Sequence, residues 1–105
     1  MALGILSFGL RQLAGVEFWA RRLDDARIHA AEGLGLGLET GNENVVLVDH
    51  GILAAVAAVR GEERACRDEA EAALLGAIDR SNRDAMNWAD LALGHLDLSL
   101  GRPEA

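Results

Sequence analysis

Residues 45–59 read VVLVDHGILAAVAAV, and only Asp49 and His50 interrupt this apolar run. The run is long for a strand, and its apolar residues point in nearly every direction around a helix drawn through it. A helix that is apolar on all sides is buried on more than one side. We therefore expect this segment to be the middle layer of a helical protein, with other helices packed around it.

The rest of the composition also favours helices. The chain has 105 residues, half of them apolar, which is enough for one small domain with a core. It contains no Tyr, and Thr and Pro occur once each. Few residues that prefer strands are thus present, and we predict an all-α fold.

Charge and cysteine content exclude several function classes. The formal net charge is −7, and all ten basic residues are Arg. An acidic surface repels nucleic-acid phosphates and anionic membranes, so we expect neither as a partner. The absence of Lys excludes a P-loop lysine and a Schiff base. Cys66 is the single cysteine, which predicts a cytoplasmic protein, and the apolar start from Met1 to Leu10 has neither the basic region of a signal peptide nor the length of a membrane span.

Turn signals divide the chain into five predicted helices. Asp24 and Asp25 suit the start of the second helix, Gly41 suits its left-handed end, and Ser81 or Asn82 can cap the fifth. The predicted helices run from about Leu3 to Arg21, from near Asp24 to Thr40-Gly41-Asn42, from about Asn44 to Arg60, from Gly61-Glu62-Glu63 to near Asp79-Arg80, and from Ser81-Asn82 to Leu100-Gly101.

The turns also indicate an internal repeat. The segments around residues 21–26, 60–65 and 101–105 resemble one another, and they align Ala26 with Ala65 and Ala105, at spacings of 39 and 40 residues. We expect a small Ala after each turn to let two helices approach closely. The predicted units are repeat 1 at about 3–41, repeat 2 at about 43–80, and an orphan helix of a third repeat at about 82–100. In the fourth helix, the spacing of Cys66, Ala70, Ala73, Leu74 and Ala77 predicts one buried stripe.

This pattern resembles tetratricopeptide-type helical repeats in a longer-period form. The segments GRPEA (101–105) and GLGLETGN (35–42) are similar to those of the repeat region in MalT-like LuxR-family bacterial transcriptional regulators. The chain departs from the usual pattern in its longer period and in the Gly residues of its second helix. The resemblance implies an antiparallel α-solenoid fragment that senses a protein, peptide or small effector between an ATPase module and a DNA-binding helix-turn-helix.

The Gly-rich segment GLGLGLETG (33–41) has two structural interpretations. Its glycines fit a helix that another helix approaches closely, while the alternation of Leu34, Leu36 and Leu38 leaves a strand open. A dinucleotide fingerprint needs G-x-G-x-x-G after a strand. Gly35-x-Gly37 is followed by Thr40, so we do not expect phosphate binding.

One cluster resembles a metal site. Asp25, His29 and Glu32 share a helix face and could supply metal ligands. Bundle metal sites use such clusters in duplicate, and only one occurs here. A solvated helix face is the favoured interpretation.

A catalytic grouping is a weaker alternative. Asp49-His50 and His95 could activate Cys66 or Ser99 only if the fold brought them within hydrogen-bond reach. Trp19 and Trp88 are expected to pack between helices, although an exposed Trp would indicate a protein contact instead.

We therefore predict an interaction module with no enzymatic activity, no catalytic residues, no cofactor and no metal. Its expected partner is a protein, a peptide or a small effector. Self-association through uncapped terminal helices is also expected, because a helical array normally ends in a polar cap and none is visible. The alternative is a small helical metal-binding or catalytic bundle.

Overall fold

The computed structural model describes residues 2–101, with side chains from Ile5 onward, and this part of the chain is all helical. Five helices follow one another, which confirms the predicted all-α class. They are α1 (Ala2–Trp19), α2 (Leu23–Thr40), α3 (Glu43–Val59), α4 (Glu63–Arg80) and α5 (Arg83–Ser99). None of these helices combines the length and apolar character that a membrane crossing requires. Pro103 and Ala105 lie outside the described residues.

The turns recur at one spacing. A residue with positive φ ends each helix region: Arg21, Gly41, Gly61, Ser81 and Gly101. Glycine adopts this left-handed conformation easily, whereas Arg21 and Ser81 adopt it at a cost. Asn82 caps α5 as predicted, and Asn42 caps α3 in the same way, with its side chain accepting a hydrogen bond from the Val45 amide.

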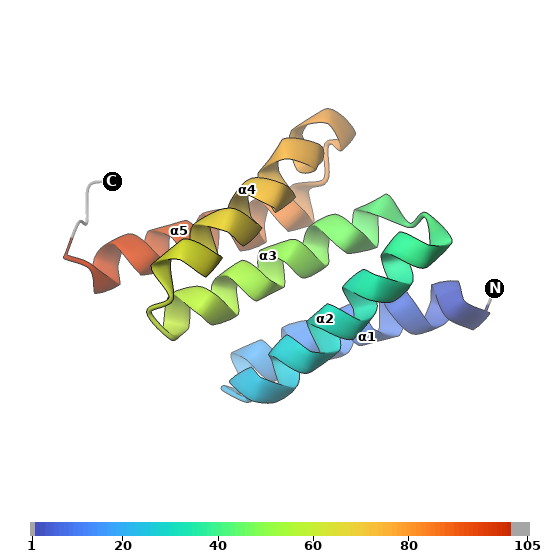
Figure 1. Cartoon of the computed structure of the whole chain (residues 1–105), viewed down its shortest axis with the longest axis horizontal. Coiled ribbons are helices and arrows are strands. Elements are labelled where there is room, and N and C mark those ends of the chain that lie inside the picture. Colours follow the sequence, from blue (N-terminus) through green and yellow to red (C-terminus); the bar gives the residue numbers. More distant parts are fainter. Residues whose placement is uncertain (1, 102–105) are drawn as a thin grey trace.

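The apolar helix α3 is the middle layer, as predicted. It packs against all four other helices. Figure 1 shows α3 between the α1–α2 pair and the α4–α5 pair, with α2 and α4 in front and α1 and α5 behind. Eleven of its residues are buried, among them Ile52 and Val56 near its centre. Burial on several sides requires the apolar residues that its sequence places in every direction.

Buried positions recur along the chain, but in a register that differs from the predicted one. Ala65 is exposed, and Cys66 occupies the buried position that corresponds to Ala26. The alignment through Ala65 was wrong because it matched turn sequences rather than buried faces. The buried positions of α2 and α4 then differ by 40 residues throughout: Ala26, Ala30, Gly33 and Gly37 in α2, and Cys66, Ala70, Ala73 and Ala77 in α4.

The Gly-rich segment is helical up to Thr40, so the strand alternative is wrong. A Cβ on Gly33 would lie 2.7 Å from Asp49 Oδ2, and one on Gly37 would lie 2.8 Å from Val46 Cγ2. Both positions therefore allow α3 to approach α2 closely, as the helical interpretation predicted. Gly35 faces open space and has no such role.

Candidate functional site

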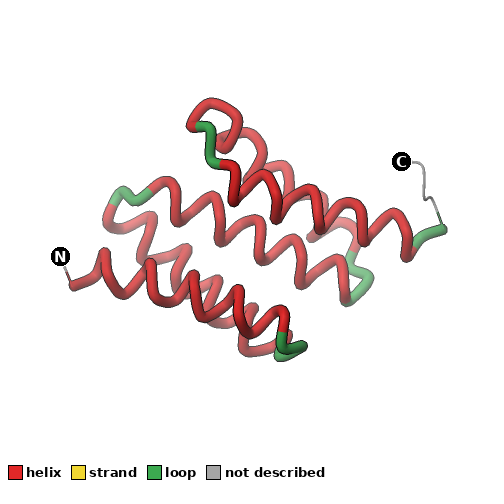
Figure 2. The backbone as a smooth tube through the Cα atoms, turned by 180° about the vertical axis from the view of Figure 1, so that it is seen from behind, coloured by secondary structure: helices red, strands yellow, loops and turns green. Residues whose placement is uncertain are grey.

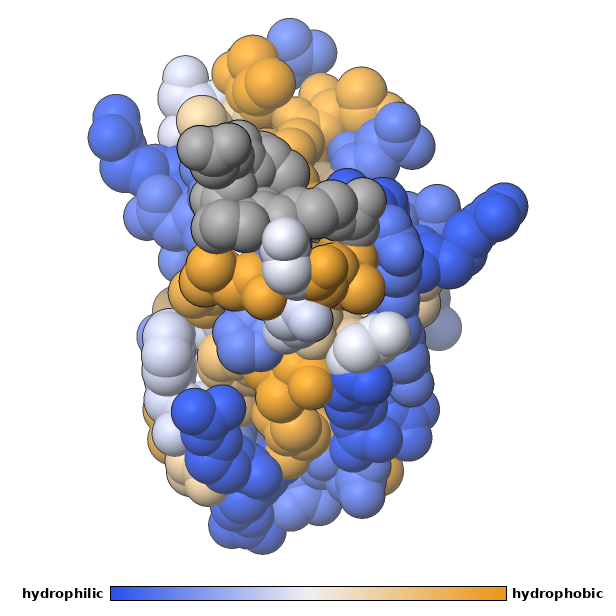
Figure 3. All heavy atoms as spheres, turned by 90° about the vertical axis from the view of Figure 1, so that its left-hand side faces the viewer, coloured by the Kyte–Doolittle hydropathy of each residue, from blue (hydrophilic) through white to orange (hydrophobic). Residues whose placement is uncertain are grey.

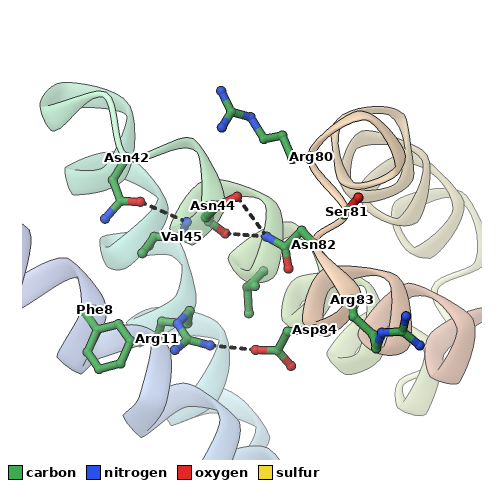
Figure 4. Close-up of a pocket in the computed structure, with 11 residues that line it drawn as sticks. Phe8, Arg11, Asn42, Asn44, Val45, Arg80, Ser81, Asn82, Arg83 and Asp84 are labelled. Carbon is green, nitrogen blue, oxygen red and sulfur yellow. Dashed lines mark hydrogen bonds and ion pairs between the residues drawn. The ribbon is translucent and has the colours of Figure 1, made fainter.

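A groove runs between α1 and α5 across one end of α3. Its volume is about 460 Å³. We call it the polar groove, and Figure 4 shows the residues that line it: Phe8, Arg11, Asn42, Asn44, Val45, Val48, Arg80, Ser81, Asn82, Arg83 and Asp84. Its arginines and amides come from four helices, α1, α3, α4 and α5, and from two turns.

Arg11 is one of the side chains that lie between α1 and α5. Gly51 lets α5 approach α3 closely, because a Cβ there would lie 2.6 Å from the Cβ of Trp88. The position one repeat earlier is Arg11, and α1 packs less extensively on α3 than α5 does. The large Arg side chain in place of Gly keeps α1 away from α3. The polar groove occupies the resulting gap.

Ion pairs and amide contacts hold the walls of the groove. Arg11 Nη1 donates to Asp84 Oδ2 at 2.8 Å and so links α1 to α5 (Figure 4). The Arg11 guanidinium also lies 4.7 Å from the centre of the Phe8 ring, a cation–π distance. The Asn82 side-chain amide donates to the backbone and side-chain oxygens of Asn44, each at 3.3 Å. These contacts fix the position of the groove's polar groups.

Two further arginines lie at the mouth of the groove. Arg80 is paired with Glu43 at 2.8 Å. Arg83 points away from the Arg11–Asp84 pair in Figure 4, and it has no acidic partner among the described residues. Because Arg11 and Arg80 are each paired with a carboxylate, Arg83 is the one arginine of the lining whose charge is not balanced by a described acidic residue. The mouth can therefore attract an acidic group.

An aromatic hollow continues the groove along the same face. Its lining comprises Trp19, Asp84, Asn87, Trp88 and Leu91, so it shares Asp84 with the polar groove. The ring centroids of Trp19 and Trp88 are 6.0 Å apart. Trp88 is partly buried against the core, as expected, but Trp19 is 65 % exposed, so the core prediction for Trp19 was wrong. An exposed Trp beside a second Trp is typical of a binding surface.

The aromatic hollow rests on a rigid base. Phe18 lies beneath both tryptophans, with ring centroids 5.2 Å from Trp19 and 5.3 Å from Trp88 in edge-to-face arrangements. Phe18 is itself buried in the core. The exposed Trp19 ring is thus held in place from one side. Binding of a ligand over this ring would therefore cost the protein little side-chain entropy.

The alternative metal cluster of Asp25, His29 and Glu32 is not assembled in the structure. His29 Nδ1 lies 2.7 Å from Glu17 Oε1 on α1, and Asp25 is paired with Arg22 instead. Among the described residues, no three His, Cys, Asp or Glu side chains are grouped to hold a metal ion. The contact with Glu17 raises the pKa of His29, although burial opposes this in part. This pair links α1 to α2.

The residues of the alternative catalytic grouping are dispersed over the fold. His50 Nδ1 lies 2.6 Å from Glu69 Oε1 of α4. His95 is near the C-terminal end of α5, where it lines the same pocket as Trp19. Cys66 is fully buried, and burial raises the pKa of its thiol, so it is protonated and unreactive at neutral pH. Ser99 is the exposed last residue of α5.

Asp49 is fully buried, and neither carboxylate oxygen has a hydrogen-bond partner among the described residues. Burial raises its pKa to about 8, and the charge of Arg11 opposes this in part. Its carboxyl group packs on Gly33 of α2. Asp49 therefore belongs to the packing between helices rather than to either binding surface.

Comparison with known protein families, curated proteins and solved structures found no match to this chain. The resemblance to MalT-like regulators stays a prediction.

The polar groove itself was missed by the sequence analysis. The available signal was the recurrence of Asn at positions 42 and 82, which cap the starts of α3 and α5. Arg11 gave no signal, because its importance depends on the space that it opens.

Proposed function

We propose that this chain is a peptide-binding module whose ligand lies along the polar groove and the aromatic hollow. The observation that carries the proposal is the continuity of the two surfaces through Asp84. The polar groove provides arginines and amides, and the aromatic hollow provides the exposed Trp19 ring, which packs on Phe18. Such a surface suits a short segment that carries an acidic residue followed or preceded by a large apolar side chain.

Selection from a random peptide library tests the proposal. Enriched peptides should contain an acidic and a large apolar residue, and their affinity by calorimetry should fall about tenfold or more with Trp19→Ala or Arg83→Glu, since each loss removes an anchor worth 1.4 kcal/mol or more. Leu75→Ala and Arg64→Glu are matched controls, because both residues are exposed on α4, away from the groove. Enriched peptides that bind all four variants equally would contradict the proposal.

We further propose, from the resemblance in its repeats, that the module belongs to a bacterial transcriptional regulator. The segments GRPEA (101–105) and GLGLETGN (35–42) support this proposal. The coding sequence on either side of this chain tests it. A P-loop upstream and a helix-turn-helix downstream are the expected findings, and a flanking sequence with neither would contradict the assignment.

A further inference from the structure

Two carboxyl groups are buried among the described residues, and they differ in their partners. Glu17 Oε1 lies 2.7 Å from His29 Nδ1, whereas neither oxygen of Asp49 has a hydrogen-bond partner. Figure 3 shows the usual arrangement at one end of the molecule, where strongly hydrophilic side chains extend into solvent. Ionisation of a buried carboxyl group without a partner is costly, so Asp49 needs either a proton or a cation.

Only a side chain can supply a cation or a hydrogen-bond donor to Asp49. Figure 2 shows that helices surround the middle of α3 and that the turns lie at the ends of the helices. The backbone amides inside a helix are already bonded within that helix, so none is free to donate to Asp49. On α2, the residue against the carboxyl group is Gly33, which has no side chain that could donate.

Arg11 of α1 is the charged side chain that acts on Asp49. A Cβ on Gly33 would meet Asp49 Oδ2 at 2.7 Å and Leu10 Cβ at 3.4 Å, so the carboxyl group lies near the residue that precedes Arg11. The charge of Arg11 opposes the rise that burial causes in the pKa of Asp49. Ionisable groups on the other helices packed on α3 are engaged elsewhere: His29 of α2 with Glu17, Glu69 of α4 with His50, and Asp84 of α5 with Arg11.

The partner that Arg11 has in the polar groove binds it weakly. The Asp84 side chain is 54 % exposed, whereas that of Arg11 is 14 % exposed. An ion pair that is open to water contributes little, because water screens it. A buried carboxylate gains far more from a cation, because it has lost its own hydration. Once Asp49 is ionised, the guanidinium is therefore more stable against Asp49 than against Asp84.

We propose that Asp49 and Asp84 compete for Arg11, and that ionisation of Asp49 draws the Arg11 guanidinium out of the polar groove. The proton of Asp49 passes to water, and an Arg11–Asp49 ion pair replaces the contact between Arg11 Nη1 and Asp84 Oδ2, which links α1 to α5 (Figure 4). Asp84 lines both the polar groove and the aromatic hollow, and it then carries an unpaired negative charge. The surface changes from one that attracts an acidic group to one that repels it.

Nuclear magnetic resonance of the full chain measures this exchange of partners directly. As the pH is raised from about 5 to about 9, the Arg11 Nε–H signal and the carboxyl carbon of Asp84 should shift together with the carboxyl carbon of Asp49. In Asp49→Asn, the signals of Arg11 and Asp84 should keep their low-pH positions throughout. Titration of Asp49 without a change at Arg11, or titration of Asp49 near its ordinary value of 3.8, would overturn the proposal.

A second variant tests the competition without altering the core. Asp84→Asn removes the exposed competitor, so the pH midpoint of Asp49 should fall by about half a unit or more, because Arg11 is then available to it. Asp90→Asn is the matched control, since it makes the same change at another exposed carboxyl group of α5. Equal midpoints for Asp49 in wild type and in both variants would overturn the proposal.

The effect on binding rests on the proposed peptide-binding function and is measured separately. The affinity of a selected peptide that lacks His should fall about tenfold as the pH passes through the Asp49 transition in wild type, and it should stay constant in Asp49→Asn. Equal affinity on both sides of the transition would overturn the regulatory role. If the library yields no peptide, the proposed function fails, while the resonance titration still decides whether Arg11 changes partner.

Discussion

Asp49 shows how one residue sets a pH dependence for the whole fold. An ordinary Asp has a pKa near 4, and burial raises that of Asp49 to about 8. The folded protein therefore keeps a proton that the unfolded chain releases as the pH rises above about 4. This difference favours the folded state at low pH, is lost progressively between about pH 4 and pH 8, and stays constant above that range. The pairing of His29 with Glu17 acts in the same direction, because it also raises a pKa.

Substitution of Asp49 isolates this effect. Asp49→Asn keeps the shape without an ionisable group, so the free energy of unfolding of the variant relative to wild type should rise from pH 4 to pH 8 and then level off. Urea unfolding across this range measures the difference, and using the difference cancels contributions of the other groups. A difference that does not change with pH would show that Asp49 is not protonated in the fold.

The backbone conformations of Arg21 and Ser81 destabilise the folded protein. Both have positive φ, at 66° and 53°, where Gly41, Gly61 and Gly101 occupy the equivalent turn positions. A side chain in this conformation costs about 1 kcal/mol. Arg21→Gly and Ser81→Gly should therefore each stabilise the protein by about 0.5–1 kcal/mol in urea unfolding, whereas Gly41→Ala should destabilise it by a similar amount. Destabilisation by both substitutions to Gly would contradict this account of the turns.

At the scale of the helices, the sequence predicted the number of helices, the all-α class and the central position of α3. These features depend on apolar periodicity and on turn residues. The alignment of Ala65 with Ala26 failed, since turn sequences can match while the buried face begins one residue later, at Cys66. The groove could not be predicted, because it depends on the distance between helices. That distance is set by tertiary neighbours at positions such as Arg11 and Gly51.

The close approach of α3 and α5 makes a quantitative prediction at this scale. Gly51→Ala should destabilise the protein by about 1–3 kcal/mol, because the added Cβ would lie 2.6 Å from the Cβ of Trp88. Gly35→Ala makes the same chemical change on an open helix face, and it should stabilise the protein by up to about 1 kcal/mol. Thermal and urea unfolding of both variants provide the test. Equal effects of the two substitutions would mean that the α3–α5 contact is looser than described.

At the scale of the whole molecule, the two outer helices differ in the faces that they leave uncovered. In α3, Glu43, Leu47 and His50 contact α4, through Arg80, Gly76 and Glu69 respectively. One repeat later, α5 carries the exposed polar residues Arg83, Asn87 and Asp90 at these positions; Arg83 lines the polar groove and Asn87 lines the aromatic hollow. Leu91 and Leu98 are 38 % and 66 % exposed on the same side of α5, so apolar side chains accompany these polar ones. Self-association through the terminal helices stays a prediction.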